Sequence, residues 1–164
     1  MTAYVTRFPS PVGELILTAS AHALTGVYFP TSRHGPPPVG TPDDGAHAVL
    51  ARTRLELTEY FAGARTTFDL PLDPSGSEFE LQVWALLRAI PYGATTTYGD
   101  LARRLGDVKL SRAVGAANGK NPIPIIVPCH RVIGANGDLT GFGGGIDRKR
   151  WLLEHEGALL ALKA

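Results

Sequence analysis

The sequence predicts a two-domain α+β protein, with a small α/β domain over residues 1–76 and a mostly helical domain over residues 77–164. Short runs of β-branched and aromatic residues lie near the N-terminus, and helical spacing of apolar residues dominates the second half. A segment with proline and glycine at 71–76 separates the two halves. With 44% hydrophobic and 19% charged residues, a chain of 164 residues has enough apolar side chains to bury a core.

The N-terminal domain is expected to contain a short antiparallel sheet. Residues 2–8, 14–19 and 23–29 are rich in β-branched and aromatic residues, which favour strands. Pro9–Gly13 predicts a turn between the first two strands, and residues 66–70 predict one more strand.

A loop and one helix complete this domain. Prolines and glycines dominate residues 31–45, which predicts a loop. Apolar residues then recur at helical spacing over 46–62, and Gly63 is placed to end the helix.

The C-terminal domain begins with a helix over 77–90. Ser77 and Glu80 form the sequence signature of a capping box, in which each side chain satisfies a main-chain N–H of the first turn. Phe79, Val83, Trp84 and Leu87 give this helix an apolar face, and Pro91 ends it.

Residues 97–106 and 110–119 predict two short helices joined by a turn, which is typical of a helix-turn-helix. The second helix is rich in alanine and glycine, with Arg112 near its start. Such small residues suit close approach to a sugar-phosphate backbone in a narrow groove better than reading major-groove base edges. A plain helical hairpin packed on a core is the alternative.

The charge is unevenly distributed. The net charge is +1 overall, but −4 over residues 1–87 and +6 over residues 88–150. The basic segment indicates a polyanionic partner, although a chance fluctuation in surface charge is the alternative.

Cys129 is the only cysteine, which excludes an intramolecular disulfide and a zinc site of several cysteines. Three prolines over residues 122–128 fix the backbone before it, and a β-like apolar run is expected to deliver it beside His130. An imidazole and the charge of Arg131 favour a reactive thiolate, whereas a lone cysteine is otherwise an inert buried residue. Glu154 and Glu156 are both candidates to orient the histidine.

The segment Pro128–Gly134, with sequence PCHRVIG, resembles the O6-alkylguanine-DNA alkyltransferase family, also called methylated-DNA–protein-cysteine methyltransferases. Flanking blocks extend the resemblance from about residue 78 to 157: 79–93, 97–99, 112–115, 118–122, 141–145 and 156–157. The cysteine motif is highly specific, and the resemblance is weak before residue 78.

The resemblance implies that Cys129 accepts an alkyl group from a guanine flipped out of duplex DNA, once per molecule. His130 and Glu156 would relay the thiol proton, Asn121 would hold the cysteine loop, and Tyr98 would rotate the phosphate and donate to guanine N3. These five are the expected catalytic residues.

The resemblance also implies a DNA surface and a substrate pocket. Arg112 would fill the gap left in the base stack, and the backbones of Cys129, Val132 and Gly143 would read the guanine edge. Phe142 stands where many relatives carry tyrosine. The expected DNA-binding residues are Arg112, Tyr98, Ala113, Gly115, Ala116, Asn118 and Arg131, and the expected pocket residues are Val132, Phe142, Gly143 and Gly144.

Taken singly, these residues have ordinary explanations. Arg112 suits a phosphate contact or surface charge, Tyr98 a core aromatic and Asn121 a turn.

We expect a cytoplasmic monomer that binds double-stranded DNA through the minor groove and needs no cofactor, metal or membrane. The other functions considered are a lesion-binding relative without chemistry, a transcriptional regulator and a cysteine hydrolase. The lesion-binding relatives lack the cysteine that this chain has.

Overall fold

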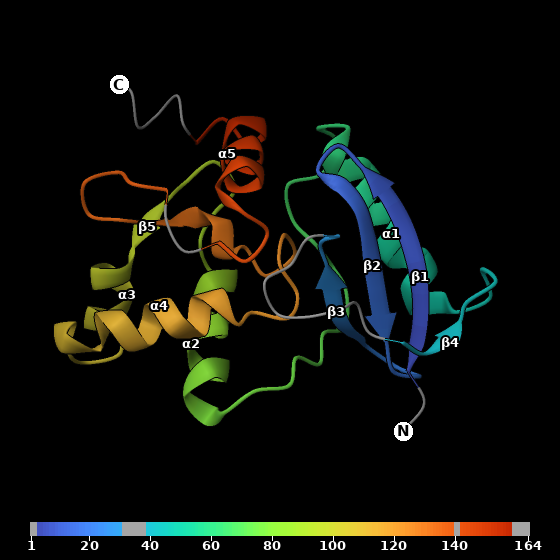
Figure 1. Ribbon diagram of the computed structural model, residues 1–164, viewed down its shortest axis with the longest axis horizontal. Coiled ribbons are helices and arrows are strands. Elements are labelled where there is room, and N and C mark those ends of the chain that lie inside the picture. Colours follow the sequence, from blue (N-terminus) through green and yellow to red (C-terminus); the bar gives the residue numbers. More distant parts are fainter. Residues whose placement is uncertain (1–2, 31–38, 140–141, 159–164) are drawn as a thin grey trace. The chain divides into compact units, whose positions relative to one another are not determined.

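The computed structural model describes residues 3–30, 39–139 and 142–158. The chain divides into two compact units, Met1–Ser75 and Gly76–Ala164, which are coloured from blue to green and from green to red in Figure 1. The first unit holds a sheet and one long helix, and the second holds most of the helices, which confirms the predicted α+β class.

The first unit contains a four-stranded sheet in the order β3-β2-β1-β4. β1 (Tyr4–Ser10), β2 (Gly13–Ala19) and β3 (Leu24–Tyr28) pair antiparallel, as predicted, and β4 (Thr41–Pro42) pairs parallel to β1. β4 lies in the predicted loop over 31–45, of which residues 31–38 lie outside the described part of the chain.

Two further details of the prediction for this unit are wrong. β1 continues through Pro9 and Ser10, so the turn to β2 is shorter than expected. Residues 66–70 form no strand, and Leu72 makes only an isolated bridge with Leu24. Instead of pairing with a strand, the main-chain N–H of Asp69 donates to the buried Glu56 carboxylate at 2.8 Å.

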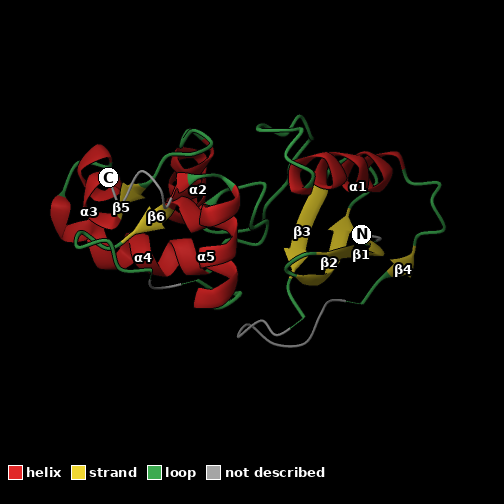
Figure 2. Ribbon diagram, turned by 90° about the horizontal axis from the view of Figure 1, so that it is seen from above, coloured by secondary structure: helices red, strands yellow, loops and turns green. Residues whose placement is uncertain are grey.

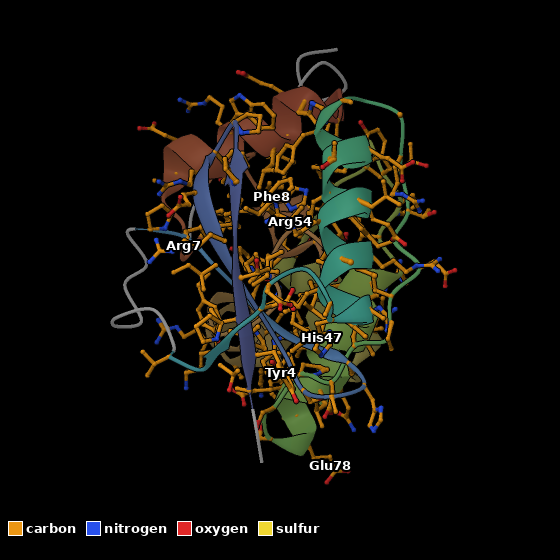
Figure 3. The ribbon with its side chains drawn as sticks, turned by 90° about the vertical axis from the view of Figure 1, so that its right-hand side faces the viewer. Tyr4, Arg7, Phe8, His47, Arg54 and Glu78 are labelled. Atoms are coloured by element: carbon orange, nitrogen blue, oxygen red, sulfur yellow. The ribbon has the colours of Figure 1, made fainter. Side chains whose placement is uncertain are left out.

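α1 (Ala48–Phe61) packs against the sheet, as Figure 2 shows. Its buried residues recur at helical spacing, and Gly63 follows its end at a φ of 78°, as the sequence predicts. His47 caps the start of the helix, because its Nδ1 accepts the N–H of Leu50 at 3.3 Å. The His47 ring also contacts the Tyr4 ring, and Arg54 lies over the Phe8 ring (Figure 3).

The second unit begins with α2 (Glu78–Arg88), whose predicted capping box between Ser77 and Glu80 is confirmed. The predicted helix-turn-helix is present as α3 (Tyr98–Arg104), the short 3₁₀ helix η1 (Val108–Leu110) and α4 (Ser111–Gly119). Both α2 and α3 pack against α4. The buried Trp84 indole of α2 donates to the Ala117 carbonyl of α4 at 2.8 Å, which holds α4 in place.

The cysteine segment lies in the same unit. The 3₁₀ helix η2 (Cys129–Arg131) leads into β6 (Val132–Ile133), which pairs parallel to β5 (Thr96–Thr97). This pairing, which the sequence did not predict, brings the start of α3 beside the end of the cysteine motif. α5 (Ile146–His155) completes the unit. No helix in the described part of the chain has the length and apolar character to cross a bilayer.

Candidate active site

The segment before Cys129 is a turn and not the β-like run that the sequence predicts. Ile125 has a φ of 75°, which a β-branched residue adopts only under strain. The Asn121 side chain stabilises this turn, because its Oδ1 accepts the N–H of Ile123 at 3.0 Å and its Nδ2 donates to the Val127 carbonyl at 2.8 Å. The turn places Cys129 in a buried position, 4% exposed.

His130 and Glu156 form a buried pair, with 2.8 Å between His130 Nε2 and Glu156 Oε2. Glu154 is exposed, so the structure selects Glu156 from the two candidates. Burial lowers the pKa of His130, although the Glu156 carboxylate acts to raise it. Burial by itself raises the pKa of Glu156, but hydrogen bonds and charges from His130 and Arg131 outweigh it and lower the pKa to about 2.

These pKa directions give a neutral imidazole beside an ionised carboxylate at neutral pH. Nε2 of His130 then carries the proton that Glu156 accepts, which leaves Nδ1 as a free base. Nδ1 is buried and has no hydrogen-bond partner among the described residues. The pair can therefore accept a proton at Nδ1 and stabilise the imidazolium that forms.

Arg131 is buried, 6% exposed, and does not lie at the DNA surface where it was expected. Its guanidinium bonds both Glu156 oxygens, at 2.8 and 3.0 Å, and donates to the Ile90 carbonyl at 2.6 Å. It also lies over the Tyr92 ring. Arg131 therefore orients and neutralises the carboxylate that is hydrogen-bonded to His130.

Asn118 is likewise buried, 1% exposed, although it was expected to contact DNA. It lies on the face of α4 that also buries Val114 and Ala117, and this face packs inside the unit. Its Nδ2 donates to the Cys129 carbonyl at 3.3 Å. The helical register of α4 therefore turns this side chain toward the cysteine and away from solvent.

The opposite face of α4 is exposed and carries Arg112, Ala113 and Ala116, three of the expected DNA-binding residues. A Cβ atom on Gly115 would lie 3.8 Å from the Tyr98 ring, so the structure brings these two expected residues side by side. On the exposed face of α4, Arg112 is therefore a long cationic side chain among small ones.

The expected pocket residues lie close to the cysteine segment along the chain. Val132 is fully buried directly after η2, and Phe142 and Gly144 are also buried, with Gly143 half-buried. The Gly145 N–H donates to the Phe142 carbonyl at 3.0 Å, which closes a turn over these residues.

Lys149 is a residue of this region that the sequence analysis missed. Its side chain is fully buried, and Nζ donates to the Val132 carbonyl at 2.6 Å. Burial lowers the pKa of Lys149 to about 8. Burial raises the pKa of the Cys129 thiol to about 11, and the Asn121 amide and the Lys149 charge act to lower it.

The spacing of Lys149 from Leu152 and Leu153 could have revealed its burial, since residues three and four apart share one helix face. Its burial also changes the interpretation of the basic segment. Arg131 and Lys149 contribute two of that segment's positive charges, but neither reaches the surface.

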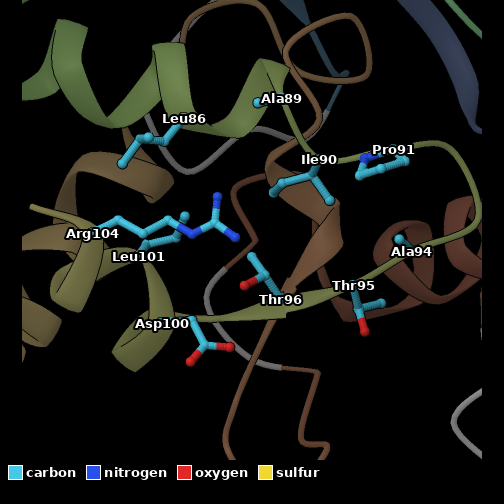
Figure 4. Close-up of a pocket in the computed structure, with 10 residues that line it drawn as sticks. All are labelled: Leu86, Ala89, Ile90, Pro91, Ala94, Thr95, Thr96, Asp100, Leu101 and Arg104. Atoms are coloured by element: carbon cyan, nitrogen blue, oxygen red, sulfur yellow. The ribbon is translucent and has the colours of Figure 1, made fainter.

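Another pocket lies beside β5, between α2 and α3, with a cavity of about 230 Å³ (Figure 4). Asp100 and Arg104 are among its polar lining residues, and Cys129 does not line it. Among the described residues, no group of three or more histidine, cysteine or acidic side chains is arranged to hold a metal ion.

Two family models match the chain. Residues 78–158 match the 6-O-methylguanine DNA methyltransferase DNA binding domain, and residues 3–74 match the ribonuclease-like domain of the same family. A methylated-DNA–protein-cysteine methyltransferase of Methanosarcina acetivorans is 45% identical over 157 residues, which are 94% of this chain and 99% of that protein. One from Mycobacterium bovis is 49% identical over 153 residues, 90% of this chain and 88% of that protein.

Solved structures are similar over the same length. A crystal structure of Mycobacterium tuberculosis OGT in complex with DNA matches with a TM-score of 0.87 and 46% identity, covering 94% of this chain and 93% of that one. An O6-methylguanine DNA methyltransferase from Methanococcus jannaschii matches with a TM-score of 0.65 and 29% identity, covering 88% of each chain.

Proposed function

The chain belongs to the methylated-DNA–protein-cysteine methyltransferase family, and on this premise we propose that it repairs O6-alkylguanine in DNA by transferring the alkyl group to Cys129. The observation that carries the proposal is the buried His130–Glu156 pair directly beside the only cysteine. A cysteine followed by an oriented base is an arrangement for nucleophilic chemistry.

The reaction is a displacement at carbon. The Cys129 sulfur forms a bond to the alkyl carbon while the bond from that carbon to guanine O6 breaks, and the electron pair stays on guanine. The product is a thioether, which water does not hydrolyse under cellular conditions. Each molecule therefore acts once, in contrast to a cysteine hydrolase, whose thioester intermediate water hydrolyses so that the thiol is regenerated.

The thiol must lose its proton before it attacks. Its raised pKa means that little thiolate exists at neutral pH in the free protein. We assign the proton to His130 Nδ1, through a water molecule, with Glu156 stabilising the resulting imidazolium. Guanine gains a proton in exchange for the alkyl group, and the Tyr98 hydroxyl is the proposed donor to guanine N3, which makes guanine a better leaving group.

The helix-turn-helix is the proposed DNA surface. Small residues on α4 allow this helix to approach the sugar-phosphate backbone of the minor groove closely. They are the exposed Ala113 and Ala116, together with Gly115. Arg112 takes the place of the extruded guanine in the base stack, and Tyr98 helps to rotate its phosphate. Because the small residues offer no long polar groups to base edges, a sequence-specific regulator is disfavoured.

The substrate pocket is proposed around the residues that follow η2. The backbones of Cys129, Val132 and Gly143 read the guanine edge, while the Phe142 ring stacks on the base without needing a hydroxyl. Gly144 lies at the rim of this proposed pocket and adds no side chain there. The second unit thus holds all proposed catalytic and DNA-binding residues, and the domain boundary proposed between residues 76 and 77 lies one residue after the division between the two compact units.

We further propose that the protein acts as a monomer in the cytoplasm. A reagent that depends on one free thiol needs a compartment that keeps thiols reduced. One cysteine on one chain is sufficient for one alkyl transfer, so the chemistry demands no second copy.

The test is the intact-protein mass after incubation with a duplex that carries one O6-methylguanine. We expect the mass of one methyl group to be added, and the peptide containing Cys129 to carry it. Cys129→Ser should remain unmodified and still bind the duplex. An unchanged mass in the unmutated protein, with duplex binding retained, would support the lesion-binding alternative and reject alkyl transfer.

A further inference from the structure

Asn118 has an unusual set of hydrogen bonds for a buried side chain. Its Nδ2 donates to the Cys129 carbonyl at 3.3 Å, while its Oδ1 is buried and has no partner among the described residues. The neighbouring Asn121, in contrast, uses both ends of its amide on the cysteine turn. A buried acceptor without a partner costs stability, so the fold gains little from an amide at position 118.

The orientation of the Asn118 amide follows from its neighbour. A flipped amide would place Oδ1 against the Cys129 carbonyl oxygen, and two acceptors repel each other. The Cys129 carbonyl has a second donor, because it also accepts the Val132 N–H that closes η2. If the Asn118 amide were removed, the Cys129 carbonyl would still accept the Val132 N–H. The hydrogen bond from Asn118 is therefore not needed to satisfy this carbonyl.

The position of Asn118 connects the nucleophile to a firmly held helix. The preceding Ala117 carbonyl accepts the buried Trp84 indole N–H, so α4 is anchored directly beside Asn118. The turn before Cys129 contains the strained Ile125, and strained backbone keeps its conformation only when its surroundings hold it. Asn121 holds the turn at Val127, and Asn118 holds it at Cys129.

We propose that Asn118 is a positioning residue for alkyl transfer, which holds the Cys129 carbonyl and thereby fixes the backbone that carries the nucleophilic sulfur. This inference rests on the proposed function and adds to it a residue that acts through the main chain. A displacement needs the sulfur in line with the breaking bond, and small errors in such geometry are costly. The amide is kept for this alignment at the expense of stability.

The proposal makes stability and activity respond in opposite ways. Asn118→Leu removes the donor and the unpaired acceptor, and its branched side chain has a shape close to that of asparagine. We expect its melting temperature to equal or exceed that of the unmutated protein. Its maximal transfer rate at saturating O6-methylguanine duplex should fall about tenfold or more, with an unchanged Kd for the duplex.

Asn118→Asp keeps the shape and replaces the donor with a carboxylate oxygen. It should also lose transfer rate, and transfer to the free base O6-methylguanine should fall along with transfer from the duplex. Thr53→Val is the matched control, because Thr53 is a fully buried polar residue of the first unit that donates to the Val49 carbonyl. This control should leave the transfer rate unchanged.

Three results would overturn the proposal. Transfer by Asn118→Leu at the unmutated rate would show that the amide is dispensable. Loss of rate in Asn118→Leu but not in Asn118→Asp would show that packing, not the donor, matters. A loss of rate in step with a lowered melting temperature would make Asn118 a stability residue. If the unmutated protein itself transfers nothing, the proposed function fails, whatever the variants do.

Discussion

The neutral His130 imidazole and the Glu156 carboxylate are joined by a 2.8 Å hydrogen bond in a site where neither side chain has any solvent exposure. Arg131 completes the arrangement by binding both carboxylate oxygens. A charge without solvent is stable only when it is paired, so the three groups depend on one another. The same carboxylate therefore serves the proposed chemistry and the stability of the fold.

This dependence predicts a loss of stability in acid. The pKa of Glu156 falls from its ordinary value of 4.5 to about 2 in the folded protein. The ionised carboxylate therefore contributes fully to the free energy of unfolding above pH 4.5, and this contribution disappears as the pH falls toward 2. A pKa lowered this far corresponds to about 3 kcal/mol of unfolding free energy. The lowered pKa of His130 acts in the same direction, because the unfolded chain binds its proton below pH 6.5 and the fold resists it.

Urea unfolding of Glu156→Gln between pH 7 and pH 3 checks this prediction. At pH 7 the variant should be less stable by about 3 kcal/mol or more, because Arg131 is left buried without a counter-charge. Its stability should fall less steeply with acid than that of the unmutated protein. Glu154→Gln, at an exposed position, is the control. If the stability of the unmutated protein and that of Glu156→Gln fell equally steeply between pH 7 and pH 3, Glu156 would not be the source of the acid sensitivity.

Arg112→Ala should slow transfer from duplex DNA more than transfer from free O6-methylguanine. An arginine that fills the gap in the base stack helps only when the base must leave a duplex. The measurement is the ratio of the two transfer rates, and Arg88→Ala, which removes another exposed cation of the same unit, is the control. Equal losses on both substrates would remove Arg112 from the proposed role.

Lys149→Met should slow the reaction of Cys129 with iodoacetamide at pH 7 in the absence of DNA. The buried ammonium acts to lower the pKa of the thiol, so its removal reduces the thiolate fraction. A reaction rate that is about three- to tenfold lower corresponds to a rise of up to about one unit in the pKa of the Cys129 thiol. Arg150→Met, at the exposed neighbouring position, should react at the normal rate. The prediction fails if both variants react equally fast.

His47→Ala should lower the stability of the first unit. The Nδ1 atom of His47 accepts the Leu50 N–H at the start of α1, and Nε2 contacts the Ser20 carbonyl at 2.8 Å. Loss of a helix cap costs about 1 kcal/mol, and loss of the second contact adds to it. Thermal unfolding measures the effect, with the exposed His22→Ala as control. An unchanged melting temperature in His47→Ala would show that neither contact matters.

Local signals in the sequence determined most of the secondary structure. The Ser77–Glu80 capping box, the three strands and both helices of the helix-turn-helix depend on residues only a few positions apart, which is why pattern and spacing predicted them. The PCHRVIG motif indicated the family for the same reason, since its specificity lies in consecutive residues.

Only the tertiary structure decided which long-range partners meet. Spacing could not choose between Glu154 and Glu156, because the choice depends on which face of the α5 end packs against His130. The resemblance placed Arg131 among the DNA-binding residues, but its burial depends on the Glu156 carboxylate, 25 residues further along the chain. Asn118 was expected at the DNA surface for its place on α4, whereas the register of that helix turns it to the Cys129 carbonyl. These contacts join residues distant in sequence, and a local pattern does not contain that information.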